Sequence, residues 1–179
     1  SCIFSRFDAH MGVANATIRN STLGHQGINA IGSGTFTVEN STINGWNLVN
    51  LRSDYGSTWQ GELIIRNCTF VPGGGKSTSA SLVGGSYSGQ HNFGYTCYMP
   101  ERITIENLHI DDSKHPDDYQ GPAIFANFNP EMKDSSYQEK FPYVKTREVI
   151  LRKVTTASGK ELRISNNMFM FKDVKFITD

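Results

Sequence analysis

The sequence predicts an all-β fold in which short strands stack in repeated coils, and three observations lead to this prediction. Glycine and asparagine are plentiful, no long stretch has the apolar spacing of an amphipathic helix, and one eight-residue phrase recurs along the chain. The 179 residues fit a single domain, and 37% hydrophobic with 19% charged residues is too apolar for disorder and too polar for a membrane protein.

Charge and cysteine content exclude several classes of function. Seventeen Lys and Arg balance seventeen Asp and Glu, and no long basic block occurs, which argues against nucleic acid as the main partner. No apolar run is long enough to predict a membrane span. Cys2, Cys68 and Cys97 leave at least one thiol unpaired and match no zinc spacing, so neither a disulfide framework nor a zinc site is expected.

The recurring phrase contains a slip in its alternation of apolar and polar residues. Its six copies are ATIRNSTL, FTVENSTI, LIIRNCTF, ITIENLHI, VILRKVTT and FMFKDVKF, which start at Ala16, Phe36, Leu63, Ile103, Val149 and Phe169. In the first copy the alternation slips by one residue at Arg19 and Asn20. A straight strand would then turn its later side chains to the opposite face, so we expect the chain to bend there.

Asparagine is suited to this bend, because it adopts the left-handed backbone region more readily than other non-glycine residues. Two short strands are therefore expected to meet at an Asn corner. The aligned corner positions are Ser1, Asn20, Asn40, Asn67, Asn107, Lys153 and Asp173, at intervals of 19, 20, 27, 40, 46 and 20 residues. The minimum period is about twenty residues, and the excess is assigned to loops.

A third short apolar segment lies between successive phrases. These segments are INAI, LVNL, SLVG, AIFAN and ELRI, which start at Ile28, Leu48, Ser81, Ala123 and Glu161. Three strands in a coil of about twenty residues resemble the right-handed parallel β-helix of the pectate-lyase-like superfamily, whose coils stack about 4.8 Å apart. The resemblance covers nearly the whole chain.

The resemblance implies one domain, residues 1–179, with about six coils of three short strands each. The resemblance rests on the Asn corner and on one column of stacked like residues, Ile18, Val38, Ile65, Ile105, Leu151 and Phe171. A left-handed hexapeptide helix and a leucine-rich repeat are the alternatives, disfavoured by the coil length and by the missing leucine ladder. Both ends fall inside a coil, so we expect a fragment of a longer helix, or ends covered by a partner such as a second copy.

Loop lengths indicate where a site would lie. If the Asn corner joins the second and third strands, as the resemblance implies, the variable loops flank the first strand. Long loops are expected at 53–61, 71–80, 85–100, 111–121 and 128–145, mostly on coils three to five. They would form two walls with a groove between them, and pectate lyases and related glycoside hydrolases bind polysaccharide in such a groove.

The residues assigned to this groove suit sugar binding, because pyranose rings present apolar faces to aromatic rings and hydroxyl edges to polar groups. The candidate substrate-binding residues are His10, Asn50, Tyr55, Trp59, Tyr87, Tyr95 and Asn127, and Tyr98 lies in the same loop as Tyr95. We expect Trp59 to be exposed, whereas each tyrosine could equally pack against its own loop.

The candidate catalytic residues are Asp8, Asp54, Arg52 and His91. If Met11 stacks with Ile31 and Leu51, alternation sends Asp8 and His10 outward on the face of Asn50 and Arg52. Two coils separate Asp8 from Asp54, roughly 10 Å, near the spacing of an inverting acid–base pair. Asp54 and Asp8 would be acid and base, with Arg52 and His91 as orienting groups. Alternatively, Arg6–Asp8 and Arg52–Asp54 are local ion pairs that brace strand ends.

The known chemistries of the superfamily leave no complete pattern. The polygalacturonase segments are incomplete, and a pectate-lyase-like reaction would need an Arg52 base and an acidic calcium site. The DDSKHPDD segment offers Asp111, Asp112, Asp117 and Asp118 for calcium, although such loops are more often only solvated. No other metal or cofactor is predicted.

The first functional hypothesis is a polysaccharide-binding β-helix segment on a secreted protein, a cell surface or a virion surface. Cleavage as a glycoside hydrolase or a lyase is left open. The alternative is a structural or receptor-binding module of a phage tailspike or virion appendage; an adhesin is disfavoured by the irregular coil spacing. A groove with free acid, base and aromatics would favour an enzyme, whereas charges tied up in local ion pairs would favour the appendage.

Overall fold

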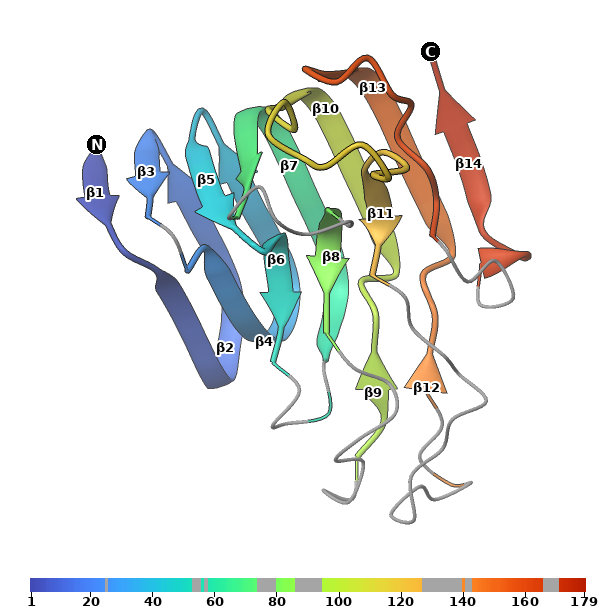
Figure 1. Ribbon diagram of the computed structural model, residues 1–179. Coiled ribbons are helices and arrows are strands. Elements are labelled where there is room, and N and C mark those ends of the chain that lie inside the picture. Colours follow the sequence, from blue (N-terminus) through green and yellow to red (C-terminus); the bar gives the residue numbers. More distant parts are fainter. Residues whose placement is uncertain are drawn as a thin grey trace.

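The protein is all-β in the part that the structure describes (Figure 1). The computed structural model describes residues 1–24, 26–52, 56, 58–73, 80–85, 95–126, 140, 143–165 and 171–179. Fourteen strands there form one sheet of twelve strands and one separate pair, and every pairing between them is parallel. No helix in these ranges is long and apolar enough to cross a membrane. The predicted all-β, parallel architecture is thus confirmed.

Each pass of the chain returns beside an earlier one. The strands of the large sheet are β1 (Cys2–Phe4), β2 (Phe7–Arg19), β3 (Ser21–Leu23), β4 (Ile28–Glu39), β5 (Thr42–Gly45), β6 (Asn47–Leu51), β7 (Trp59–Pro72), β8 (Ser81–Gly84), β10 (Arg102–Ile110), β11 (Ala123–Phe125), β13 (Glu148–Thr156) and β14 (Lys175–Thr178). The separate pair is β9 (Cys97–Tyr98) and β12 (Tyr143–Val144). The two termini lie at opposite ends of the stack (Figure 1).

The phrase corners are confirmed at five positions. Asn20, Asn40, Asn67, Asn107 and Lys153 have φ angles of 51°, 50°, 52°, 53° and 51°, all in the left-handed region. The asparagine side chains also join one coil to the next: the Nδ2 groups of Asn40, Asn67 and Asn107 donate to the Oδ1 atoms of Asn20, Asn40 and Asn67, at 3.2, 3.3 and 2.9 Å. The same residue therefore turns the backbone and fixes the stacking.

The long strands align in the predicted register. Ile18, Val38, Ile65, Ile105 and Leu151 pair in line across β2, β4, β7, β10 and β13. The first four are almost fully buried. Because each side chain contacts its equivalent in the next coil, the column forms a continuous apolar core.

The sixth copy of the phrase was aligned wrongly. β14 pairs with β13 at Leu151–Thr178, so Thr178 rather than Phe171 continues the column, and Asp173 is not a left-handed corner. Phe171 instead stacks on Phe125, with ring centroids 4.2 Å apart and planes at 10°. Residues 175–178 form a short apolar segment of their own, and the pairing with β13 shows that this segment, not the aligned phrase, is the strand of the last coil.

The first strands stack in a second series. Phe7, Ile28, Val49, Val83 and Phe125 pair in line through β2, β4, β6, β8 and β11, and all but Phe7 are buried. The segments INAI, LVNL, SLVG and AIFAN therefore pair as expected, and Arg163 of ELRI forms a parallel bridge with Ala123.

The inner column of these strands is not the one predicted. Ala9, Ala30 and Leu51 pair in line, whereas Met11 was expected to stack with Ile31 and Leu51. The register of β2 against β4 shifts between Ala9 and Val13, so counting back from the corner gives the wrong residue.

A second set of bends lies within the long strands β2, β4 and β7. Asn15, Gly34 and Gly61 have positive φ angles of 61°, 83° and 140°. A Cβ atom on Gly61 would overlap the carbonyl oxygen of Gly34, and the Asn15 Oδ1 accepts a hydrogen bond from the Thr35 amide at 2.9 Å. β2 and β4 therefore turn sharply while remaining paired.

The long connections are shorter than expected, because strands extend into them. β7 occupies the end of the expected loop 53–61 and the start of 71–80. β9 and β12 lie within the expected loops 85–100 and 128–145, and they pair with each other. Loops on neighbouring coils thus lie side by side, as predicted, where the structure describes them.

The edge strands β1 and β2 each pair on one side only, and Ile3 is 89% exposed. Coverage of this edge by a partner or a longer chain stays a prediction.

Candidate functional site

A row of polar side chains follows the outward face of the first strands. Asp8, Asn29 and Asn50 pair in line, and the Asn50 Nδ2 donates to the Asn29 Oδ1 at 3.0 Å. Asn47 connects this row to the interior: its Nδ2 donates to the Asn50 Oδ1 at 3.4 Å, and its Oδ1 accepts from the hydroxyl of the buried Ser81 at 2.5 Å. The predicted placement of Asp8 and Asn50 on one face is therefore correct.

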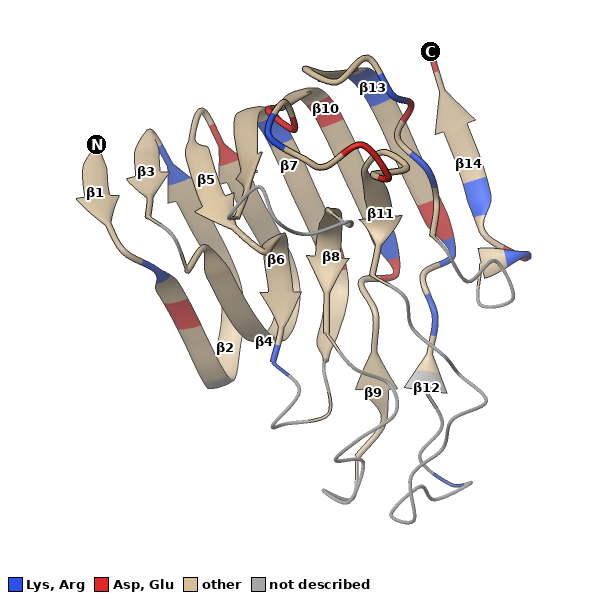
Figure 2. Ribbon diagram, in the orientation of Figure 1, with Lys and Arg blue, Asp and Glu red and all other residues tan. Residues whose placement is uncertain are grey.

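Arg52 extends along this face to a charged cluster at β2. Its Nη1 donates to the Asp8 Oδ1 at 2.6 Å and lies 3.0 Å from the His10 Nε2. The Arg6 Nη2 lies 3.3 Å from the other oxygen of Asp8. Figure 2 shows this acidic position near the start of β2, with a basic position just before it.

The cluster does not have the geometry of a free general base. Both oxygens of the Asp8 carboxylate contact a guanidinium group, so each oxygen is already part of an ion pair. The predicted alternative, a local ion pair between Arg and Asp two residues apart, holds for Arg6 and Asp8. The hydrogen bond from Arg52 to Asp8 also links two coils and so stabilises their stacking.

Several candidate residues lie outside the described residues. They are Asp54 and His91 of the catalytic set, and Tyr55, Tyr87 and Asn127 of the substrate-binding set. Their roles stay predictions.

Trp59 is fully buried, with 0% of its surface exposed, so the expectation of an exposed tryptophan was wrong. Its indole Nε1 donates to the Gly34 carbonyl at 3.0 Å, and its ring lies 4.9 Å from that of Phe36. β7 begins at Trp59 opposite Gly32, where the lack of a side chain leaves room for the indole ring. Trp59 therefore supports the bend from inside instead of presenting a stacking surface.

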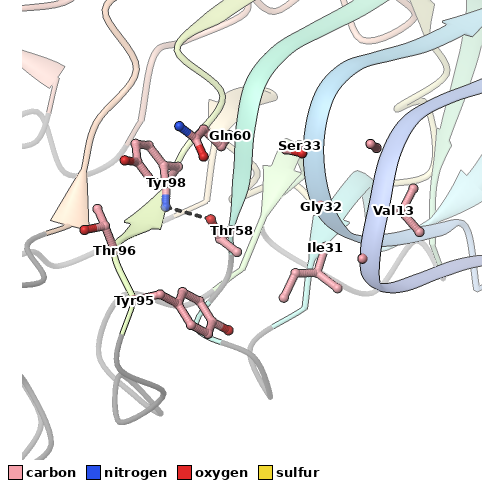
Figure 3. Close-up of a pocket in the computed structure, with 11 residues that line it drawn as sticks. Val13, Ile31, Gly32, Ser33, Thr58, Gln60, Tyr95, Thr96 and Tyr98 are labelled. Carbon is pink, nitrogen blue, oxygen red and sulfur yellow. Dashed lines mark hydrogen bonds between the residues drawn. The ribbon is translucent and has the colours of Figure 1, made fainter.

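A pocket of about 560 Å³ opens on the outer side of this bend (Figure 3). Val13 of β2 and Ile31 of β4 supply apolar surface on one side. Tyr95, Thr96 and Tyr98 face them from the chain segment around β9, which belongs to a later coil (Figure 3). Residues far apart in sequence thus meet at one concave surface.

One hydrogen bond fixes the two sides of the pocket relative to each other. The Tyr98 amide donates to the Thr58 Oγ1 at 2.9 Å, and Thr58 is itself buried (Figure 3). The next residues continue this contact, because the Glu101 amide donates to the Gly61 carbonyl at 2.7 Å. The tyrosine side is therefore held by one bond to the Thr58 side chain, just before β7, and by one bond to the backbone of β7.

Four polar side chains at this pocket have no partner among the described residues. They are the side chains of Ser33, Gln60, Thr96 and Tyr98, which make no hydrogen bond or ion pair there. Gln60 is exposed, and the other three are partly exposed, so water satisfies them in the free protein. Their hydroxyl and amide groups remain available to a ligand.

Sequence reasoning found only part of this pocket. Tyr95 was a substrate-binding candidate and Tyr98 was noted in the same loop, but Val13, Thr58 and Gln60 were missed. A usable signal was present, because aligning FTVENSTI with LIIRNCTF already places Gln60 beside Ser33. What the alignment does not contain is the return of residues 95–98 against Thr58.

The acidic segment 111–121 serves a structural role in the described fold. The buried Asp112 carboxylate accepts hydrogen bonds from the Tyr119 hydroxyl at 2.9 Å and from the amide and hydroxyl of Ser158 at 2.7 and 2.6 Å. Burial, and then the bond to Asp112, raise the pKa of Tyr119 well above its usual range. No group of three or more His, Cys, Asp or Glu side chains gathers in the described ranges, so the calcium hypothesis finds no ligand set there.

Neither of the two buried cysteines, Cys68 and Cys97, provides a reactive thiolate at neutral pH. Burial raises the pKa of Cys97 to about 12 and also raises that of Cys68. All three cysteines are free thiols, and only Cys2 is exposed.

Comparison with known proteins adds no assignment, since no family model, curated protein or solved structure matches the chain. Function is therefore inferred from the pocket and from the polar side chains on the first strands.

Proposed function

We propose that the chain forms a right-handed parallel β-helix of about six coils that binds a polysaccharide at the pocket between the β2–β4 bend and the segment Tyr95–Tyr98. The parallel pairing and the left-handed corners support this fold. One observation carries the function: the pocket combines apolar side chains and tyrosines with polar groups that have no described partner.

This combination suits a sugar ring better than most other ligands. A pyranose needs an apolar or aromatic surface for its C–H face and separate hydrogen-bonding groups for its hydroxyl edge. The volume of about 560 Å³ lies within the usual range of small-molecule sites. The half-buried side chains of Asn29 and Asn50, which pair in line, would contact a neighbouring sugar unit of an extended chain.

Binding is better supported than cleavage. Asp8 is engaged by Arg6 and Arg52, so the acid–base pair would need Asp54 to act with another group. The proposal is therefore a glycan-binding segment, with cleavage dependent on Asp54 and His91.

The same ion pairs favour a second candidate function, a structural or receptor-binding module of a tailspike or virion appendage. Ion pairs that hold neighbouring coils together would stiffen a rod-shaped module. Size-exclusion chromatography with light scattering separates the two candidates, because an appendage of this kind would assemble as a symmetric trimer.

The Tyr98→Ala variant tests the glycan site. A glycan array first selects ligands for the wild-type chain, and isothermal titration then measures the affinity of the variant. Loss of an aromatic contact should weaken binding about tenfold. Trp46→Ala is the matched control, because Trp46 is 62% exposed and does not line the pocket. Absence of any glycan ligand would reject the function, and unchanged affinity in Tyr98→Ala would reject the site.

A further inference from the structure

The described lining of the pocket is electrically neutral. None of the described residues that line it carries a charged side chain. The described parts of the two adjoining segments, residues 56, 58–60 and 95–99, contain no charged side chain. The described wall of the pocket therefore holds neither a cation nor an anion.

The arginines on the neighbouring first-strand face are already bonded. Arg52 donates to Asp8 at 2.6 Å, and Arg6 lies 3.3 Å from the same carboxylate. Moving either guanidinium to a ligand would leave Asp8 without that partner. These residues consequently do not supply a free cation to the pocket.

An anionic sugar would be disfavoured in this setting. A carboxylate or sulfate that loses water needs a guanidinium or ammonium partner, since an unpaired buried charge is costly. Hydroxyl and amide groups such as those of Ser33, Gln60 and Thr96 instead match the donors and acceptors of neutral sugar hydroxyls.

We infer that this site selects neutral hexose units over uronic acids and sulfated sugars, an inference that rests on the proposed glycan-binding function. Gln60 has a central part in this selection. It lies on β7 beside Ser33, its amide has no described partner, and its side chain is exposed at the pocket. An amide there can donate to and accept from hydroxyl groups without favouring an anion.

The test compares two oligosaccharides of equal length and linkage, one of neutral hexoses and one of the corresponding uronic acids. Isothermal titration at low and at moderate salt should show at least tenfold tighter binding of the neutral oligomer, with little dependence on salt. Equal or tighter binding of the uronic acid oligomer would overturn the inference while leaving glycan binding in place. Binding of neither oligomer, together with an empty glycan array, would overturn the proposed function itself.

The Gln60→Lys variant sharpens this experiment by placing a cation at the pocket. Affinity for the uronic acid oligomer should rise and become salt-dependent, and the preference for the neutral oligomer should shrink. Gln120→Lys, in the exposed part of segment 111–121, is the control with the same change of charge far along the chain. An unchanged preference in Gln60→Lys, with an unaltered melting temperature, would contradict the selection by charge.

Discussion

Asparagine at each corner combines a backbone role with a side-chain role. The φ angle of Asn40 is 50°, a conformation that costs most L-residues about 1–2 kcal/mol. Its amide also donates to Asn20 and accepts from Asn67. The corner is therefore stabilised both by local backbone preference and by bonds between coils.

Substitution of Asn40 separates these two roles. Asn40→Ala should destabilise the protein by about 1–3 kcal/mol, since it loses both the backbone preference and the ladder bonds. Asn40→Gly should cost less, because glycine adopts the left-handed region freely. Chemical unfolding followed by circular dichroism measures both. Equal stability of the alanine variant and the wild type would contradict the assigned role.

His115 is a residue whose charge state matters to stability. Both ring nitrogens are buried without a hydrogen-bond partner, and the ring meets Tyr119 edge-on with centroids 4.1 Å apart. Burial lowers the pKa of His115 below 6.5, although the nearby Asp112 acts in the opposite direction. The folded protein therefore favours the neutral imidazole.

The pH dependence of stability follows from this shift. Below about pH 6.5 the unfolded chain takes up a proton at His115 before the folded chain does, so the free energy of unfolding falls as pH falls. His115→Phe should lose less stability than the wild type between about pH 7.5 and 5.5. Thermal unfolding at both pH values provides the measurement. His109→Gln is the control, because His109 is exposed beside Thr155, and identical pH slopes in wild type and His115→Phe would refute the expectation.

At the scale of elements, charges alternate in sign along the outward face of the long strands. One column consists of Arg19, Glu39, Arg66, Glu106, Arg152 and Asp179, and a second consists of Glu62, Arg102, Glu148 and Lys175. If every coil had the same charge at these positions, stacking in register would place like charges side by side. The alternation favours the observed pairing, because a slip by one coil would bring equal charges together.

Arg102 is the central cation of the second column. Its Nη1 lies 3.1 Å from Glu62 and its Nε lies 2.8 Å from Glu148. Arg102→Glu would place three carboxylates in a row and should destabilise the stack by about 1–2 kcal/mol. The loss should shrink at about 1 M salt, which screens exposed charges. Arg102→Gln removes the charge without adding repulsion, so its loss of stability should depend less on salt. A loss of stability in Arg102→Glu that does not change with salt would argue against an electrostatic cause.

At the scale of the whole molecule, the predictable features were those repeated in every coil. Asn20, Asn40, Asn67 and Asn107 recur with the same neighbours, so the corner and the apolar column could be aligned without a structure. The last coil lacked an Asn corner, and two short apolar segments competed for its second strand. There the pairing of β14 decided the register.

The candidate site was less predictable than the fold, because it forms between coils. Asp8 and Arg52 could be placed on one face by alternation, but their direct bond depends on how far Arg52 reaches along the stack. The burial of Trp59 depends on a gap opposite it at Gly32. Neither feature follows from the local pattern of residues.

Alternation and the left-handed preference of asparagine are local properties, and they were enough to predict the all-β class, the position of the corners and the column of stacked residues. The enclosure of Trp59, the bonds from two arginines to Asp8 and the pocket that Tyr95 and Tyr98 close beside Thr58 became evident only from the folded chain. Local patterns specify how each coil turns, whereas contacts between distant coils depend on the packing and hydrogen bonds formed once the coils are stacked.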